Sequence, residues 1–152
     1  MMVKVKICGI TRARDAIMAA SAGADALGFN FHRPSPRYLE PDRARAIRLA
    51  LPPFLSTVGV FVDHEPDEVR RIAQYCQLDY VQLHGRESPR VAAVLGDLRL
   101  IKAIRIAGEE DLKELERYDV AAFLLDAFAP ELPGGTGQTF DWQLARRAAS
   151  RA

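Results

Sequence analysis

Residues 56–84, STVGVFVDHEPDEVRRIAQYCQLDYVQLH, contain the pattern that decides the fold. A run of β-branched and aromatic residues at 56–62 is followed by an amphipathic stretch at 66–76 and by a second apolar run at 80–84. Pro66 stands at the expected first helical position, where its missing N–H leaves no hydrogen bond unmade. A strand, a helix and a strand in this order predict a parallel βαβ unit with a right-handed crossover.

The same alternation of short and long patterns extends over the whole chain. The expected strands are Val3–Cys8, Ala24–Phe31, Ser56–Val62, Tyr80–His84, Leu100–Arg105 and Ala121–Asp126. The expected helices are Ala13–Ala22, Pro41–Leu51, Pro66–Cys76, Ser88–Leu95, Glu109–Tyr118 and Asp141–Ala149. Because no linker or low-complexity segment separates them, we expect one domain over residues 1–152.

Two architectures are built from such units, an open doubly wound sheet and a closed eight-stranded barrel. The strand expected at Val3–Cys8 alternates valine and isoleucine with lysine and cysteine, so one face is apolar and the other polar. A barrel strand packs its apolar face under helices, and its inner face turns polar toward the catalytic mouth, so the pattern favours a barrel.

The composition is that of an ordinary globular chain, with 49% hydrophobic and 27% charged residues. The net charge of +1 leaves no basic surplus for nucleic acid or an acidic membrane. No apolar run approaches the ~20 residues that cross a bilayer, and Met1–Cys8 lacks the apolar stretch of a secretory signal, so we expect a cytoplasmic protein. Two cysteines are too few for a disulfide scaffold and match no zinc spacing.

The segment Lys6-Ile7-Cys8-Gly9-Ile10-Thr11 resembles the opening motif of the phosphoribosylanthranilate isomerases. Further segments resemble later strands and loops of that family, in the family's order: Gly23–Phe29, Ser35–Tyr38, Val58–Phe61, Val81–Gly85, and Leu125–Ala127 with Gly134–Gly137. One such motif is weak evidence, whereas six in order are specific. The resemblance implies a (β/α)8 TIM-barrel fold, with about six of the eight βα units present in this chain.

The resemblance also implies a reaction of tryptophan biosynthesis. Members of the family convert N-(5-phosphoribosyl)anthranilate to 1-(2-carboxyphenylamino)-1-deoxyribulose 5-phosphate by an Amadori rearrangement. They use no metal and no organic cofactor, because general acids and bases supply the proton transfers. The expected partner is therefore this small-molecule substrate, without nucleic acid or membrane.

The resemblance assigns the two catalytic roles to the ends of two expected strands. Asp126 is the acid that protonates the ribose ring oxygen, and Cys8 is the base that takes the proton from C2 of the opened sugar. Lys6, two positions before Cys8 on the same strand face, is a candidate for favouring the thiolate. Without the family, Cys8 is interpreted as a small core residue and Asp126 as the cap of a loop.

Substrate binding is expected from three residues. Arg37 offers a carboxylate two parallel N–H groups, and the resemblance pairs it with the anthranilate carboxylate. Gln82 and His84 share a strand face and are expected to hydrogen-bond the sugar or orient the substrate. The alternatives are a surface role for Arg37 and a structural role for His84.

Several other residues are left open. Lys102 and Arg105 are uncertain because their spacing sends them to opposite faces. Asp141 joins the site or, as we favour, caps the last helix. Cys76 is expected only to pack. Gly134–Gly137 lacks the lysine and spacing of a phosphate-binding P-loop, and we expect it to close over the substrate.

The chain departs from the family after the position of Trp142. The family has about two further βα units there, with glycine-rich loops that bind the substrate phosphate. Nothing after Gln143 resembles them, so we expect a fragment, or a shortened chain completed by another copy or another protein. Open strand edges are expected to drive oligomerisation or aggregation unless something covers them, and another copy of the chain is one candidate cover. We expect low or absent turnover by the isolated chain, and a non-catalytic fragment is the alternative function.

Overall fold

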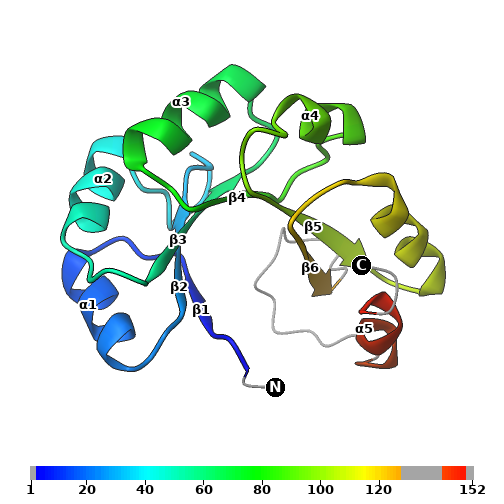
Figure 1. The fold of residues 1–152 in the computed structure, drawn as a ribbon, viewed down its shortest axis with the longest axis horizontal. Coiled ribbons are helices and arrows are strands. Elements are labelled where there is room, and N and C mark those ends of the chain that lie inside the picture. The colour runs from blue at the N-terminus through cyan, green and yellow to red at the C-terminus, as the bar shows by residue number, and fades with distance from the viewer. Residues whose placement is uncertain (1–2, 128–141, 150–152) are drawn as a thin grey trace.

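The computed structural model describes residues 3–127 and 142–149. Six parallel strands pair in chain order, and the sheet curls into an open half-barrel with the helices α1 to α4 along its outer side (Figure 1). The strands are β1 Lys6–Cys8, β2 Ala26–Asn30, β3 Ser56–Phe61, β4 Tyr80–Leu83, β5 Leu100–Ile106 and β6 Ala122–Ala127. The sequential order and the curl confirm the expected barrel-type α/β fold with six βα units and exclude the doubly wound sheet.

A helix or helical turn follows each strand. These elements are α1 Ala13–Ser21, α2 Pro41–Leu49, α3 Pro66–Cys76, α4 Pro89–Val94, η1 Glu109–Arg117 and α5 Trp142–Ala148. Three of them begin at proline, and Ser88 caps α4 by accepting a hydrogen bond from the Val91 N–H. Within the described ranges, no helix is both long and apolar enough to cross a membrane.

Two expected elements differ most from the structure, and the ends of the others agree to within two residues. The expected helix at Glu109–Tyr118 is a 3₁₀ helix, η1, whose entry is held in a tight turn because Asp111 Oδ2 accepts the N–H groups of Ala107 and Gly108 at 2.7 and 2.9 Å. The first strand begins at Lys6 rather than Val3. There the Asp25 carboxylate, instead of a strand carbonyl, accepts the Val5 N–H at 2.8 Å.

The outer face of the sheet forms the hydrophobic core with the helices. Its strand residues are nearly inaccessible to solvent: Leu27, Phe29, Phe61, Val81, Leu83 and Leu100. A second cluster packs η1 and α5 against β5 through Ile104, Ile106, Leu112, Leu115, Leu144 and Ala148. Because paired residues of parallel strands face the same side, the opposite set of residues lines the concave side of the half-barrel.

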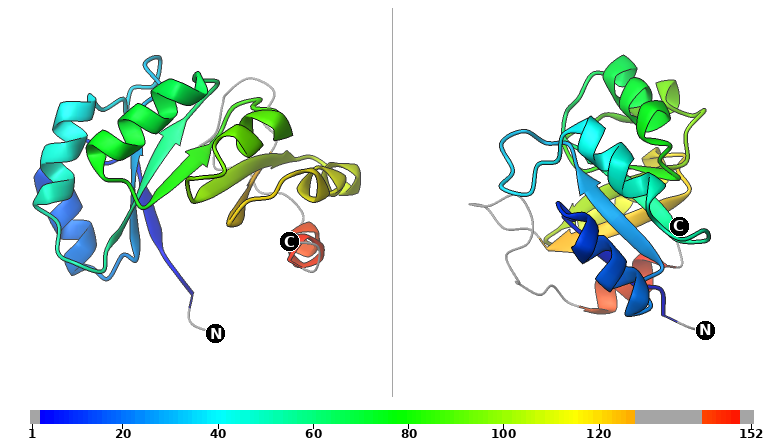
Figure 2. Two further views of the ribbon diagram at one scale, coloured as in Figure 1. Left: turned by 45° about the horizontal axis from the view of Figure 1, so that its top comes forward. Right: turned by 90° about the vertical axis from the view of Figure 1, so that its left-hand side faces the viewer.

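The first and last strands stand apart from each other (Figure 2). Among the described residues, β1 pairs only with β2, and β6 pairs only with β5. The outer-face side chain of Ile7 on β1 is consequently 41% exposed. Both edges therefore offer unpaired backbone groups to a further strand.

Candidate active site

The residues expected to act lie where the parallel strands end, on the concave side of the half-barrel. Cys8 ends β1, Arg37 lies in the connection after β2, and Gln82 lies within β4. His84 follows β4 directly, and Asp126 lies one residue before the end of β6. The structure groups them into two clusters, one around β1 and β2 and the other around β4, β5 and β6.

The first cluster contains an exposed free thiol beside an ammonium group. Cys8 pairs with Gly28 across the β1–β2 ladder. A Cβ atom added to Gly28 would lie 2.9 Å from Cys8 Sγ and 3.2 Å from Lys6 Nζ, so both groups flank one point of the inner face. The absence of a side chain at residue 28 leaves the room that the thiol occupies. Lys6 is therefore close enough to Cys8 to act on the thiol's charge, and that role stays a prediction.

Arg37 reaches the same cluster from the connection after β2. Its Cδ lies 2.5 Å from the place of a Cβ at Gly9, whose φ of +86° also favours glycine. Ser35 Oγ shapes the connection because it accepts hydrogen bonds from the Asn30 side-chain amide at 3.0 Å and from the Arg37 N–H at 3.2 Å. Among the described side chains, no carboxylate pairs with the exposed Arg37 guanidinium, which leaves it available to an anion.

The second cluster is a short chain of polar contacts centred on His84. Gln82 Nε2 lies 2.7 Å from His84 Nδ1, and His84 Nε2 lies 3.3 Å from Asp126 Oδ2. With the amide donating to Nδ1, the ring proton is on Nε2 and faces the carboxylate. In the described part of the chain, Gln82 Oε1 is buried without a hydrogen-bond partner. Asp126 Oδ2 is buried there too, and the long contact with His84 is its only one. Two buried polar atoms facing the concave side are suited to a polar ligand.

The electrostatic surroundings keep the His84 ring neutral. Its pKa lies below the ordinary value, first because burial disfavours the charged imidazolium. The Asp126 carboxylate opposes this shift, whereas the positive charges of Arg105 and Lys102 add to it. A neutral His84 donates one hydrogen bond and accepts another, which matches its two neighbours.

Arg105 is the inner-face residue that the sequence left undecided. It pairs with Asp126 across the β5–β6 ladder, so its side chain lies on the same face as that carboxylate. Lys102 faces the other way and is buried against Glu87 under the helical layer. Spacing alone predicted opposite faces for the two basic residues. The pairing with Asp126, which no local pattern reveals, identifies Arg105 as the one in the site.

The remaining predictions concern Cys76, Asp141 and Gly134–Gly137. Cys76 is fully buried at the end of α3, its Sγ donates to Pro41 O at 3.4 Å, and burial raises its pKa to about 11, all of which fits a packing role. Asp141 and Gly134–Gly137 lie outside the described residues. Glu87 was not predicted from the sequence, because apart from Gly85 its contacts come from residues 15 to 31 positions away.

Comparison with known proteins gives a consistent match. A family model described as N-(5'phosphoribosyl)anthranilate (PRA) isomerase matches residues 5–151. The N-(5'-phosphoribosyl)anthranilate isomerase of Geobacter sp. (strain M21) is 54% identical over 144 residues, which cover 95% of this chain and 70% of that protein.

Solved structures match over nearly the whole chain. Phosphoribosyl anthranilate isomerase from Thermotoga maritima has a TM-score of 0.92 and 44% identity, covering 99% of this chain and 73% of its own. Monomers generated from the dimeric form of that enzyme have a TM-score of 0.85 and 38% identity, covering 99% and 72%. A phosphoribosyl anthranilate isomerase in complex with reduced 1-(o-carboxyphenylamino)-1-deoxyribulose 5-phosphate has a TM-score of 0.86 and 40% identity, again covering 99% and 72%.

Proposed function

We propose that this chain, which belongs to the N-(5'-phosphoribosyl)anthranilate isomerase family, acts as an isomerase of tryptophan biosynthesis. The reaction is the Amadori rearrangement of N-(5'-phosphoribosyl)anthranilate to 1-(2-carboxyphenylamino)-1-deoxyribulose 5-phosphate. The observation that supports it best is the placing of a thiol and a carboxylate, Cys8 and Asp126, at the mouth ends of two parallel strands of one half-barrel. A related enzyme that binds a reduced form of this product adds support for the substrate class.

Asp126 serves as the general acid. Its proton passes to the ribose ring oxygen, the bond between C1 and that oxygen breaks, and the nitrogen lone pair forms an iminium at C1. The contact with His84 orients the carboxyl group, since the neutral ring presents an N–H toward Oδ2. Apart from this 3.3 Å contact, Oδ2 has no hydrogen-bond partner among the described residues, and its place on the concave side suits a proton transfer to bound substrate.

Cys8 serves as the general base. It removes the proton from C2 of the opened sugar, and the electron pair forms a C1–C2 double bond as the C1–N π electrons return to nitrogen. The resulting enol becomes the ketone when C1 takes up a proton and the C2 hydroxyl loses one. Cys8 Sγ and the Lys6 ammonium flank one point of the inner face, beside Gly28. The opening at Gly28 keeps the sulfur accessible to substrate.

Substrate binding uses the groups left without protein partners. Arg37 binds the anthranilate carboxylate through two parallel N–H groups. Gln82 Oε1, buried and unpartnered among described residues, accepts a hydrogen bond from a sugar hydroxyl. Arg105 places a further positive charge beside Asp126 and suits the anionic substrate.

Two further parts of the proposal concern the state of the protein in the cell. We place it in the cytoplasm, because an exposed thiol that acts as a base must stay reduced. We also propose a homo-oligomer that covers the open edges, since Val3 and Val5 before β1 and Ile7 within it expose 87%, 46% and 41% of their surface. Sedimentation of the purified chain tests this, and a stable monomer at micromolar concentration would contradict it.

The deciding experiment is turnover of N-(5'-phosphoribosyl)anthranilate by the purified chain, with Cys8→Ala and Asp126→Asn as paired variants. Loss of one general acid or base is expected to slow turnover by about 10²- to 10⁴-fold. Circular dichroism should show the same fold in all three proteins. A folded chain without turnover would favour the non-catalytic alternative, which the two open edges support. Turnover that survives both substitutions would refute the proposed roles.

A further inference from the structure

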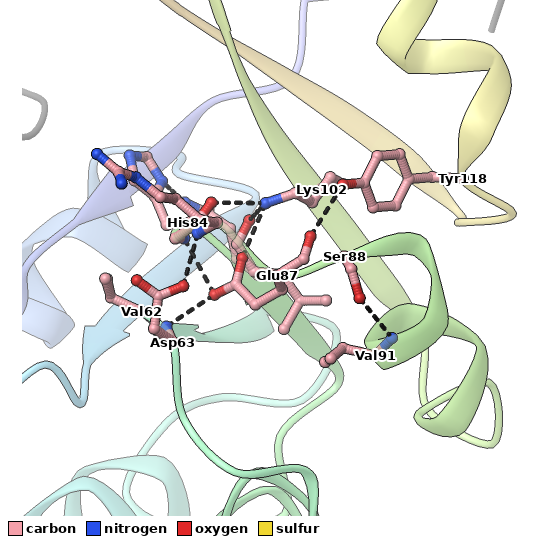
Figure 3. Close-up of polar contacts among 12 residues, drawn as sticks. Val62, Asp63, His84, Glu87, Ser88, Val91, Lys102 and Tyr118 are labelled. Atoms are coloured by element: carbon pink, nitrogen blue, oxygen red, sulfur yellow. Dashed lines mark hydrogen bonds and ion pairs between the residues drawn. The ribbon is translucent and has the colours of Figure 1, made fainter.

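Lys102 and Glu87 form an ion pair that is almost completely buried behind the mouth end of β4 (Figure 3). Lys102 Nζ lies 2.8 Å from Glu87 Oε2, and the two side chains are 3% and 2% exposed. Lys102 pairs with Leu83 across the β4–β5 ladder, so its side chain starts from the outer face of the sheet. The pair therefore lies on the side of the sheet opposite to the proposed substrate and does not face it.

The Lys102 ammonium binds the backbone on both sides of His84. Besides Glu87, it donates to the carbonyl oxygen of Leu83 at 3.4 Å and to that of Gly85 at 2.9 Å (Figure 3). These two residues immediately precede and follow His84 in the chain. The three donors of the ammonium group are thus matched by three acceptors, two of which fix the direction of the peptide that carries the imidazole.

Glu87 ties the same peptide to two other elements. Its Oε1 accepts hydrogen bonds from the N–H groups of Gly85 and Asp63, both at 3.0 Å, and Asp63 follows β3. Its own carbonyl oxygen accepts the Tyr118 hydroxyl at 2.8 Å, and Tyr118 follows η1. The His84 N–H itself donates to Phe61 O at 2.8 Å. The backbone at the end of β4 is consequently anchored from three directions.

The stability of the chain does not by itself explain such a pair. Removing two charges from water costs much of what their attraction gains, so an apolar pair of similar volume stabilises about equally well. What an apolar pair does not supply is directional hydrogen bonding to three backbone groups around one histidine. The pair is better explained by the geometry that it imposes.

We propose that Lys102 and Glu87 are positioning residues, which hold the end of β4 so that the His84 ring stays between Gln82 and Asp126. The consequence for catalysis rests on the proposed function, in which His84 orients the acid Asp126. The geometric part does not rest on it, because it concerns only where the His84 ring lies. The two parts are therefore tested by different measurements.

The geometric part is tested by the coupling between His84 and Asp126. The charged groups that act on the His84 pKa are Asp126 from β6 and Arg105 and Lys102 from β5. The His84 pKa is followed by NMR, which is practical because the chain has three histidines. In the otherwise unaltered chain, Asp126→Asn is expected to lower that pKa further, since it removes the charge that favours the imidazolium.

The same substitution is then made in the Lys102→Met/Glu87→Gln background. We expect Asp126→Asn to leave the His84 pKa nearly unchanged there, because the ring no longer faces residue 126. An equal drop in both backgrounds would overturn the proposal. If the double variant does not fold, Lys102→Met alone replaces it, because it removes the bonds to the Leu83 and Gly85 carbonyl oxygens while Glu87 keeps an oxygen for the Gly85 and Asp63 N–H groups. In that background too, a nearly unchanged His84 pKa supports the proposal and an equal drop overturns it.

The catalytic part is tested by kinetics. Misplacing His84 is expected to lower kcat by about 10- to 100-fold, with KM changed by less than about threefold. Lys113→Met is the matched control, since it removes the same charge from an ion pair with Glu110 that is exposed on η1. A raised KM with unchanged kcat would overturn a positioning role. If the unaltered chain shows no turnover, the proposed function fails while the NMR result still decides the geometric part.

Discussion

His84 Nε2 lies 3.3 Å from Asp126 Oδ2, a contact that joins the ends of β4 and β6 across the intervening strand β5. The two residues are 42 positions apart in the sequence, and only the curl of the sheet brings them together. The histidine side chain is 18% exposed, so its protonation is governed by its neighbours more than by solvent. The His84 pKa therefore responds to changes in the residues around the ring.

The first prediction concerns stability against pH. Burial lowers the pKa of His84 from its ordinary 6.5, so the unfolded chain binds this proton at a higher pH than the folded chain does. The His84 contribution to the free energy of unfolding is therefore complete above pH 6.5 and falls as the pH drops from 6.5 toward the folded-state pKa. Urea unfolding at several pH values, compared with His84→Asn, isolates this slope. A variant with the same pH dependence would show that another group is responsible.

Arg105 provides the second prediction. Its positive charge lowers the pKa of His84, so Arg105→Gln is expected to raise that pKa. NMR titration measures the change. Arg99→Gln is a suitable control, because Arg99 precedes β5 and its guanidinium stacks over the Tyr80 ring at 4.4 Å, away from His84. Equal titrations for Arg105→Gln and the unaltered chain would show that the guanidinium does not act on the ring.

Much of the fold follows from patterns that are local in the sequence. Helix α3 spans Pro66–Cys76 in the structure as it does in the expectation, because its apolar spacing and its first-turn proline are both local. The strand β1 begins three residues later than expected, since the distant Asp25 takes the hydrogen bond of Val5. Asp111 likewise fixes the first turn of η1 and favours its 3₁₀ geometry. The periodicity of the sequence does not reveal this contact.

In the candidate site, too, features set by local patterns were predicted and features set by distant residues were not. The motif and the strand ends predict that Cys8 and Asp126 face one concave surface. The Lys102–Glu87 pair was not predicted, because it depends on the register of β5 relative to β4 and on the connection after β4, which brings Glu87 to Lys102. Residue spacing gives the face of a strand, whereas the register between strands decides which neighbours that face meets.

The third prediction concerns substrate binding by Arg37. Arg37→Lys keeps the charge but loses the two parallel N–H groups, so KM is expected to rise by about tenfold while kcat changes much less. Steady-state kinetics measure both. Arg33→Lys is the matched control in the same connection, where the guanidinium lies over the Tyr38 ring at 5.5 Å. A large fall in kcat for Arg37→Lys would instead place this residue in the chemical step.

The fourth prediction separates the two thiols. Burial raises the pKa of Cys76 to about 11, and its side chain is inaccessible, whereas Cys8 is exposed. A disulfide reagent at pH 8 is therefore expected to react quickly with one thiol per folded chain, and with both after denaturation. Cys8→Ala should abolish the fast reaction. Two fast thiols in the native chain would contradict the packing role of Cys76.

The fifth prediction tests the space beside Cys8. A Cβ at Gly28 would lie 2.9 Å from Cys8 Sγ, closer than a methyl group tolerates, so Gly28→Ala is expected to displace the sulfur. Turnover should fall by about tenfold or more, because a small misplacement of a reacting group costs much of its effect. The reaction of Cys8 with a disulfide reagent should change as well, which gives a readout independent of turnover. Gly108→Ala is the control, since no atom beyond its chain neighbours lies within 4 Å of its added Cβ. Unchanged kinetics and thiol reactivity in Gly28→Ala would show that the sulfur does not occupy this position in solution.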